Sequence, residues 1–395
     1  MTINKILLNP FFLYSFIWLG TLFLYSLQFT NNLKPMVENT YFLIFSTIVS
    51  FALIYLFSKF LAVSYPKKTI LQTNNEEVIF RFKKLIKLFF NFWLIFTLLE
   101  VILFKGIPII NVLVLNQFDL DYKKFGIPTL HGFLNSIYYT LIIGYSYLLL
   151  IKKEKKYRKT LLLLFVWPVL VMSRAVLLVA LIQFLLVYII SVKIRLRQFY
   201  IILTFVFGFV YAFGLIGDSR GGGGLKRFTV ETFVNDQYIE LAEKIPSGFI
   251  WTYLYMTTPL NNVNYTIDVL KPEYKFKYTF RALLPSFIRE HLFDRDDRPL
   301  ILDDEAFNVT TFFSNFLRDV GVFGAILIVA FLQFIMTFFY FSLKKGTIGS
   351  IVSYGAIYFA LITSIFGDSF FTLAIISQIL IGIYINNKIY LKKYV

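Results

Sequence analysis

Long apolar stretches separated by short polar segments dominate the chain. A helix that crosses the hydrocarbon core of a bilayer needs about 20 consecutive apolar residues. Stretches close to this length predict ten membrane-spanning helices, at Leu8–Leu27, Tyr41–Val63, Leu85–Phe104, Gly132–Ile151, Thr160–Met172, Ala175–Ser191, Phe199–Ile216, Val320–Ser342, Ser350–Phe366 and Phe370–Ile385. The predicted fold is therefore an all-α polytopic membrane protein, with one integral membrane domain over residues 1–395.

The fifth and sixth stretches allow two interpretations. Residues Thr160–Ser191 can form one long tilted helix, or a hairpin that turns near Ser173-Arg174. The hairpin agrees with the charge pattern described next, although its first limb is only about 20 Å long at 1.5 Å per residue. The apolar pattern alone leaves both interpretations open.

Basic residues cluster after every even-numbered stretch. The clusters are Lys67, Lys68, Arg81, Lys83 and Lys84, then Lys152 to Lys159, then Lys193, Arg195 and Arg197, then Lys344 and Lys345, and finally Lys388, Lys392 and Lys393. Cytoplasmic loops carry an excess of Lys and Arg. The pattern therefore predicts that these loops and both termini are cytoplasmic.

The composition supports a membrane protein. Hydrophobic residues make up 58% of the 395 residues and charged residues 16%, whereas soluble domains carry about 25% charged residues. A soluble enzyme, a disordered chain and a nucleic-acid-binding module are therefore excluded, and the net charge of +16 is attributed to basic loops near anionic lipid. With no Cys and two His, we expect no metal site and no cofactor.

Two outer segments break the pattern of short loops. Residues 217–319 form a predicted large outer loop, which is nearly neutral because residues 217–318 hold 12 basic and 14 acidic residues. Loops of this length without structure are uncommon unless they are functional. The amphipathic stretch Val230–Lys244 predicts helices on or near the membrane surface. A smaller outer loop is predicted at 105–130.

Arg174 is the most specific single signal, because it lies in an otherwise apolar stretch. An arginine near the bilayer centre costs about 2.5–3.5 kcal/mol on insertion scales. Such a residue usually faces a polar cavity or an anionic ligand. The alternative is an arginine at a hairpin tip whose side chain reaches the outer headgroups.

Further arginines fall in the large outer loop. Arg281 and Arg289 are eight residues apart, a little over two helical turns, so they can share one helical face, although Pro285 complicates a continuous helix. Together they can bind phosphate oxygens or form ordinary salt bridges. Arg220 precedes four glycines that suit either a phosphate-binding backbone or a hinge. The same loop carries Arg227, Arg298 and Arg318. These arginines are candidate binding residues for a lipid pyrophosphate.

Two histidines and a few acids are candidates for proton transfer. His291 adjoins the arginines and is predicted to be the general base, with Asp218, Glu290 and Asp319 as competitors. His131 follows a Gly-Ile-Pro segment, and a headgroup or capping contact is the simpler interpretation.

Several motifs together resemble the O-antigen polymerases of the bacterial oligosaccharide repeat-unit polymerase family. They are Gly106-Ile107-Pro108 with Phe125-Gly126-Ile127-Pro128-Thr129-Leu130-His131-Gly132, Ser173-Arg174-Ala175, the segment from Tyr255 through Pro259 to Asn261-Asn262, Phe307 to Phe312, and Arg318-Asp319 with Gly321 and Gly324. No single motif is diagnostic, and the resemblance rests on their order along most of the chain.

The resemblance implies a fold, a reaction and partners. The fold would be the GT-C-like architecture of membrane glycosyltransferases, with helices of the large periplasmic loop at the membrane surface. The reaction would join undecaprenyl-pyrophosphate-linked oligosaccharides at the periplasmic face of a Gram-negative inner membrane, without an essential metal. It implies membrane lipid and a chain-length regulator protein as further partners, and no nucleic acid.

The resemblance also suggests roles for the candidate residues. Arg174, Arg281 and Arg289 would bind pyrophosphate or orient the glycans, with Arg220 and Arg318 in support. The aromatic rings of Tyr253, Tyr255 and Trp251 suit sugar rings as well as core packing. Three alternatives stay open: an O-antigen ligase with lipid A core as acceptor, a transporter of the lipid-linked unit, and a structural subunit.

Overall fold

The computed structural model describes residues 3–63, 76–114, 125–201, 203–204, 207–208, 211, 226–281, 283–284, 286–292, 301–304 and 307–390. These residues form helices and connections, and the only extended pairing among them is an isolated antiparallel bridge between Thr30 and Val234. The all-helical fold predicted from the sequence is confirmed.

Seven helices in the described part of the chain are long and apolar enough to cross a membrane. They are α3 (Glu38–Val63), α4 (Glu76–Leu103), α6 (Leu130–Ser146, continued by a π-helix over Tyr147–Ile151), α8 (Arg174–Ser191), α15 (Phe313–Leu343), α16 (Ile348–Ile362) and α17 (Leu373–Tyr390). The shorter helices α2 (Pro10–Ser26) and α7 (Arg158–Leu170) occupy two further predicted stretches. The stretch Phe199–Ile216 lies partly outside the described residues, so the count of ten stays a prediction.

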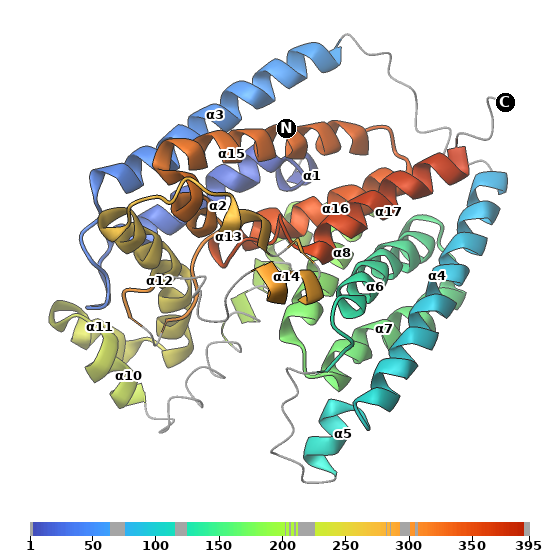
Figure 1. The fold of residues 1–395 in the computed structure, drawn as a ribbon, viewed down its shortest axis with the longest axis horizontal. Helices are drawn as coiled ribbons and strands as arrows, with labels where there is room; N and C mark the ends of the chain where they lie inside the picture. Colours follow the sequence, from blue (N-terminus) through green and yellow to red (C-terminus); the bar gives the residue numbers. More distant parts are fainter. Residues whose placement is uncertain are drawn as a thin grey trace.

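The helices form one bundle in which α16 is central (Figure 1). Gly349 of α16 and Gly382 of α17 let the two helices approach closely, because a Cβ on Gly349 would lie 2.1 Å from the Gly382 carbonyl oxygen. Small residues at such crossings are the usual means of close packing between membrane helices. In Figure 1 the N-terminus, the start of α4 and the end of α17 lie in the upper part of the view, whereas α5 (Pro108–Leu113), α10 (Lys226–Phe233) and α11 (Ile239–Lys244) lie along the lower edge.

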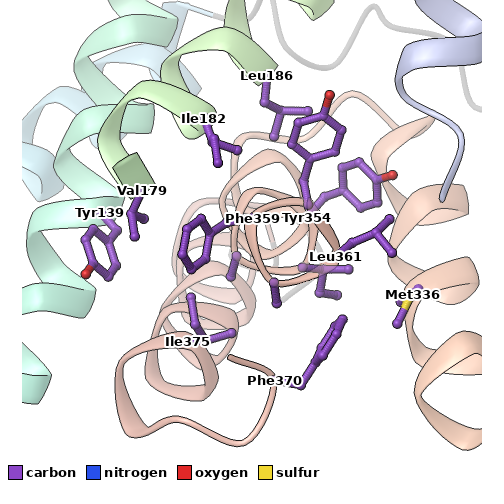
Figure 2. Packing of buried hydrophobic residues seen from close by; sticks show 14 of the residues in the cluster. Tyr139, Val179, Ile182, Leu186, Met336, Tyr354, Phe359, Leu361, Phe370 and Ile375 are labelled. Atoms are coloured by element: carbon purple, nitrogen blue, oxygen red, sulfur yellow. The ribbon is translucent and has the colours of Figure 1, made fainter. Parts of the chain in front are cut away.

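The core around α16 is built from aromatic and aliphatic side chains of neighbouring helices. Figure 2 shows Tyr354 and Phe359 of α16 on the side of Leu186 and Ile182 of α8, and Leu361 on the side of Met336 and Phe370. Two buried amides inside the bundle are paired: Gln183 and Gln378 exchange two hydrogen bonds of 2.9 and 3.1 Å. Paired amides avoid the cost of an unsatisfied polar group in an apolar interior.

The fifth and sixth predicted spans form a hairpin, so the interpretation as one long helix is wrong. Helix α7 ends at Leu170 and α8 begins at Arg174. Ser173 caps α8, since its hydroxyl accepts a hydrogen bond from the Val176 N–H at 3.4 Å. The two limbs pack against each other, with the rings of Phe165 and Phe184 5.7 Å apart.

The large outer segment contains a long helix that the apolar pattern did not predict. Helix α12 spans Ser247–Val269 and packs against α2, α3 and α15. The amphipathic stretch Val230–Lys244 does form helices, namely α10, a 3₁₀ turn at Asp236–Tyr238 and α11. Their apolar residues pack with Ile250 and Leu254 of α12. This segment is therefore built onto the bundle through α12.

Two short helices and a break in α15 complete this end of the molecule. Helix α13 spans Lys277–Arg281, and α14 spans Ser286–Leu292. Helix α15 begins seven residues before the predicted span and breaks at Gly321, whose φ of 68° is a left-handed conformation that favours glycine. The residues before this break, including Arg318 and Asp319, form a separate helical turn that faces α13.

Candidate functional site

Three asparagines of α12 form hydrogen bonds to the connection between α2 and α3 and to the segment that precedes α15. The Asn261 side chain accepts hydrogen bonds from the Tyr25 hydroxyl at 2.8 Å and the Lys34 N–H at 2.9 Å, and donates to the Asn32 carbonyl at 3.1 Å. It also donates to the Asp303 carboxylate at 3.0 Å, and Asp303 forms an ion pair with Lys34.

The other two asparagines act in the same way. Asn262 donates to the Phe307 and Val309 carbonyls, each at 2.8 Å, and accepts from the Asp303 N–H at 3.0 Å. Asn264 donates to the Pro35 carbonyl and accepts from the Val37 N–H and the Thr40 hydroxyl, all at 2.9 Å. The Tyr-Pro-Asn segment singled out in the sequence thus anchors residues 32–40, Asp303 and residues 307–309.

Arg318 is the most strongly positioned of the candidate arginines. Its side chain is 9% exposed, and its guanidinium carbon lies 3.6 Å from the centre of the Tyr278 ring. A guanidinium stacked on an aromatic face is stabilised by the ring quadrupole. Burial, followed by the hydrogen bond from the Tyr278 hydroxyl to Glu273, raises the pKa of Tyr278.

Asp319 holds α13 in place beside Arg318. Its carboxylate accepts hydrogen bonds from the backbone N–H groups of Tyr278 at 3.1 Å and Thr279 at 2.6 Å. In return, the Glu273 N–H donates to the Arg318 carbonyl at 3.0 Å. Both carboxylate oxygens of Asp319 are thus engaged with the backbone of α13.

Arg281 ends α13 next to the connection between α16 and α17. The neighbouring Phe280 contacts Phe371 with ring centres 5.7 Å apart, and Phe371 also contacts Phe316 of α15 at 5.8 Å. Phe280, which precedes Arg281, and Phe316, two residues before Arg318, therefore belong to the same aromatic cluster. Helix α13 ends at Arg281 and α14 starts at Ser286, so the expectation that one helical face carries both Arg281 and Arg289 is wrong.

The remaining candidates have less defined surroundings. Arg289 is partly buried and His291 is exposed, both on α14. Tyr255 of α12 contacts Trp251 at 6.3 Å, and Trp251 packs on Phe233 of α10. Of Arg227 only the backbone in α10 is described, and Arg220 and Arg298 lie outside the described residues.

Arg174 lies at the tip of the α7–α8 hairpin, and its side chain is exposed. Contacts link this tip to the other groups. Trp167 near the end of α7 contacts Phe125 at 6.1 Å, and Phe125 contacts His131 at 5.9 Å. Gly132 packs directly on Leu373, two residues after Phe371. The arginines at 174, 281 and 318 therefore lie at the same end of the bundle, which we call the arginine end.

A pair of ionisable groups that sequence reasoning did not join also lies at this end. Glu100 of α4 is 2% exposed, and its carboxylate oxygens lie 3.0 and 3.2 Å from Nδ1 of His131 at the start of α6. Helices α4 and α6 are adjacent. The sequence did contain a feature that could have predicted this pair: a glutamate and a histidine lie at the outer ends of two consecutive predicted spans.

Asp368 lies in the connection between α16 and α17. Its Oδ1 accepts hydrogen bonds from the N–H groups of Phe370 at 3.0 Å and Phe371 at 3.3 Å, while its Oδ2 is buried. Burial of the carboxyl raises the pKa of Asp368 to about 7, and the two backbone N–H groups and the Asn315 side chain oppose this shift. The residue as a whole is partly exposed, but its carboxyl group is not.

A groove of about 370 Å³ lies between the end of α12 and the break in α15, lined by residues that include Leu270, Tyr274, Gly321 and Phe323. Within the described residues, no group of three or more His, Asp or Glu side chains could hold a metal ion. A scan against protein-family models, a search of curated proteins and a search of solved structures each found no match.

Proposed function

We propose that the protein is an O-antigen polymerase, which joins undecaprenyl-pyrophosphate-linked oligosaccharide units and releases undecaprenyl pyrophosphate. The observation that carries this proposal is the arginine end, to which three separate parts of the chain contribute Arg174, Arg281 and Arg318. Guanidinium groups bind phosphate oxygens bidentately and stay charged at every physiological pH. They suit a donor whose leaving group is a pyrophosphate.

The proposed reaction needs few further groups. The hydroxyl of one glycan attacks the anomeric carbon of the other, and the bond from that carbon to the pyrophosphate oxygen breaks with its electron pair on the leaving group. Fixed cations stabilise the charge that develops there. One general base is enough to take the proton of the attacking hydroxyl. The resemblance described above supports this chemistry over other uses of the arginines.

The proposal also covers the arrangement of the helices, the membrane in which the protein lies and its orientation there. It comprises ten spans, a GT-C-like arrangement, a Gram-negative inner membrane, cytoplasmic termini and a periplasmic arginine end. The basic clusters after the even-numbered stretches support this orientation. Membrane lipid and a chain-length regulator protein are the proposed partners besides the lipid-linked substrate.

The residues have distinct proposed roles. Arg318, fixed on Tyr278, would bind a phosphate as part of a rigid element. Arg281 and the exposed Arg174 would close around the same pyrophosphate from α13 and from the hairpin tip. Arg289, Arg220, Arg227 and Arg298 remain proposed substrate contacts on the sequence argument alone, as does Tyr255.

Polymerisation in vitro tests the proposal directly. The purified protein would be incubated with its lipid-linked repeat unit, and products resolved by length on a gel. A ladder formed without nucleotide sugar is the expected result. Transfer only to added lipid A core would identify a ligase, and no product with either acceptor would leave transport as the better interpretation.

Arg318→Lys and Arg174→Lys sharpen this assay, because lysine keeps the charge but not the bidentate geometry. We expect both variants to lose most of their rate. Lys345→Ala is the matched control, since Lys345 lies in the exposed connection between α15 and α16 and should leave the ladder unchanged.

A further inference from the structure

Glu100 and His131 form a hydrogen-bonded pair that the surrounding backbone holds in place. Besides facing Nδ1 of His131, Oε1 of Glu100 accepts a hydrogen bond from the Ile127 N–H at 2.9 Å. The glutamate is thus held from two directions inside the protein. The histidine ring is 33% exposed, in contrast to the 2% exposure of its partner.

The chemistry of the pair assigns the histidine tautomer. A carboxylate can only accept hydrogen bonds, so Nδ1 of His131 carries the proton that points to Glu100. In the neutral ring the lone pair then resides on Nε2. No hydrogen bond to Nε2 is formed within the described residues. Because Nδ1 faces a buried group, the opposite ring edge is the one available for a ligand.

The backbone before α6 is shaped for this ring position. Gly126 has φ +106°, and a Cβ at this position would lie 2.5 Å from Nδ1 of His131. Only glycine has the conformation and the space required there. On the other side, the Phe125 ring meets the imidazole edge to face at 5.9 Å. The ring is therefore fixed by a carboxylate, a glycine and an aromatic side chain.

Contacts between aromatic and aliphatic side chains connect the pair to the arginine end. Phe125, which holds the imidazole, contacts Trp167 close to the α7–α8 turn that carries Arg174. Gly132, the residue after His131, packs on Leu373 at the start of α17. A substrate whose pyrophosphate is bound by the arginines can thus place its glycan near His131.

We propose that His131 is the general base of the polymerisation and that Glu100 is its positioning residue. This inference rests on the proposed function. Nε2 takes the proton of the attacking sugar hydroxyl while the oxygen forms the new bond to the anomeric carbon. The pyrophosphate leaves with the electrons of the broken bond, and the imidazolium, stabilised by Glu100, then releases its proton to water. The orientation of a catalytic histidine by a carboxylate on its other nitrogen is an established arrangement.

Single-turnover polymerisation rates of purified variants test the assignment. General base catalysis contributes roughly 10²–10⁴-fold to a rate, so His131→Gln should slow chain growth by about 100-fold or more at saturating substrate. Glu100→Gln, which keeps an acceptor for Ile127, should slow it as well. His291→Gln tests the other histidine. A wild-type rate in His131→Gln, or a loss confined to His291→Gln, overturns the inference.

Two measurements separate catalysis from folding. Added imidazole should restore part of the rate of His131→Ala, which a purely structural defect would not allow. Because the chain has two histidines, ¹⁵N spectra of His291→Gln report on His131 alone, and should show a protonated Nδ1 and an unprotonated Nε2 in the neutral ring. The opposite tautomer overturns the assignment. Failure of the wild-type protein to form a ladder would instead overturn the proposed function.

Discussion

Asn262→Ala is expected to destabilise the packing of α12 against the segment that follows it in the arginine end. Asn262 is 1% exposed and forms three hydrogen bonds, to the Phe307 and Val309 carbonyls and from the Asp303 N–H. The substitution removes all three and leaves their partly buried backbone partners without this acceptor and donor. An unsatisfied buried group costs about 1–3 kcal/mol.

Three such groups give an upper expectation of roughly 3–9 kcal/mol, since each group costs about 1–3 kcal/mol. Local relaxation reduces this, because residues 301–304 can move toward solvent. We therefore expect about 3 kcal/mol, the low end of that range. A destabilisation of 1 kcal/mol lowers the Tm of a domain of 150–250 residues by about 2–4 °C, so the Tm should fall by several degrees.

The assay is thermal unfolding of the detergent-solubilised protein, followed by tryptophan fluorescence. Asn31→Ala is the matched control, because the Asn31 side chain is exposed and makes a single 3.3 Å hydrogen bond to the Thr232 carbonyl. The reasoning is refuted if Asn262→Ala and Asn31→Ala unfold at the same temperature. A lower rate of polymerisation with an unchanged Tm would also contradict it, since it would mean that Asn262 contacts substrate.

Three further predictions concern other parts of the fold. Asp368→Asn should stabilise the protein relative to wild type, and increasingly so as pH rises from about 4 to 8. The pKa of Asp368 is raised from 3.8 to about 7 in the native state, so the stability of the wild type is highest below the unfolded pKa and falls as the carboxyl ionises. The fall amounts to up to about 4 kcal/mol for three pKa units. A pH-independent difference in Tm between variant and wild type would contradict this. Gly126→Ala should cost about 1–3 kcal/mol in backbone strain and displace His131, which a lower Tm and an altered histidine ¹⁵N shift would reveal. Gly382→Leu should separate α16 from α17 and prevent folding into a monodisperse particle, as measured by size-exclusion chromatography. Gly20→Leu is the control, because a Cβ at Gly20 meets nothing within 4 Å.

The arginine end shows where reasoning from the sequence succeeded and where it failed. Arg174 was correctly placed at a hairpin tip by the interpretation that respected the basic clusters, because charged residues constrain topology strongly. The shared face of Arg281 and Arg289 was wrong, since the chain leaves the helical conformation between α13 and α14. Helix α12 was missed because its buried face mixes Thr257, Thr258 and three asparagines with apolar residues, which interrupts the apolar pattern.

The sequence by itself determined the class of protein. Apolar stretches of membrane-spanning length have few alternatives to the helix, because every backbone polar group in lipid must be satisfied within its own segment. The tertiary structure alone decided which side chains meet. Glu100 and His131 are 31 residues apart in the chain, and Arg318 reaches Tyr278 across 40 residues. Such contacts depend on which helix faces pack together, and that is set by the summed packing of many side chains rather than by any local pattern.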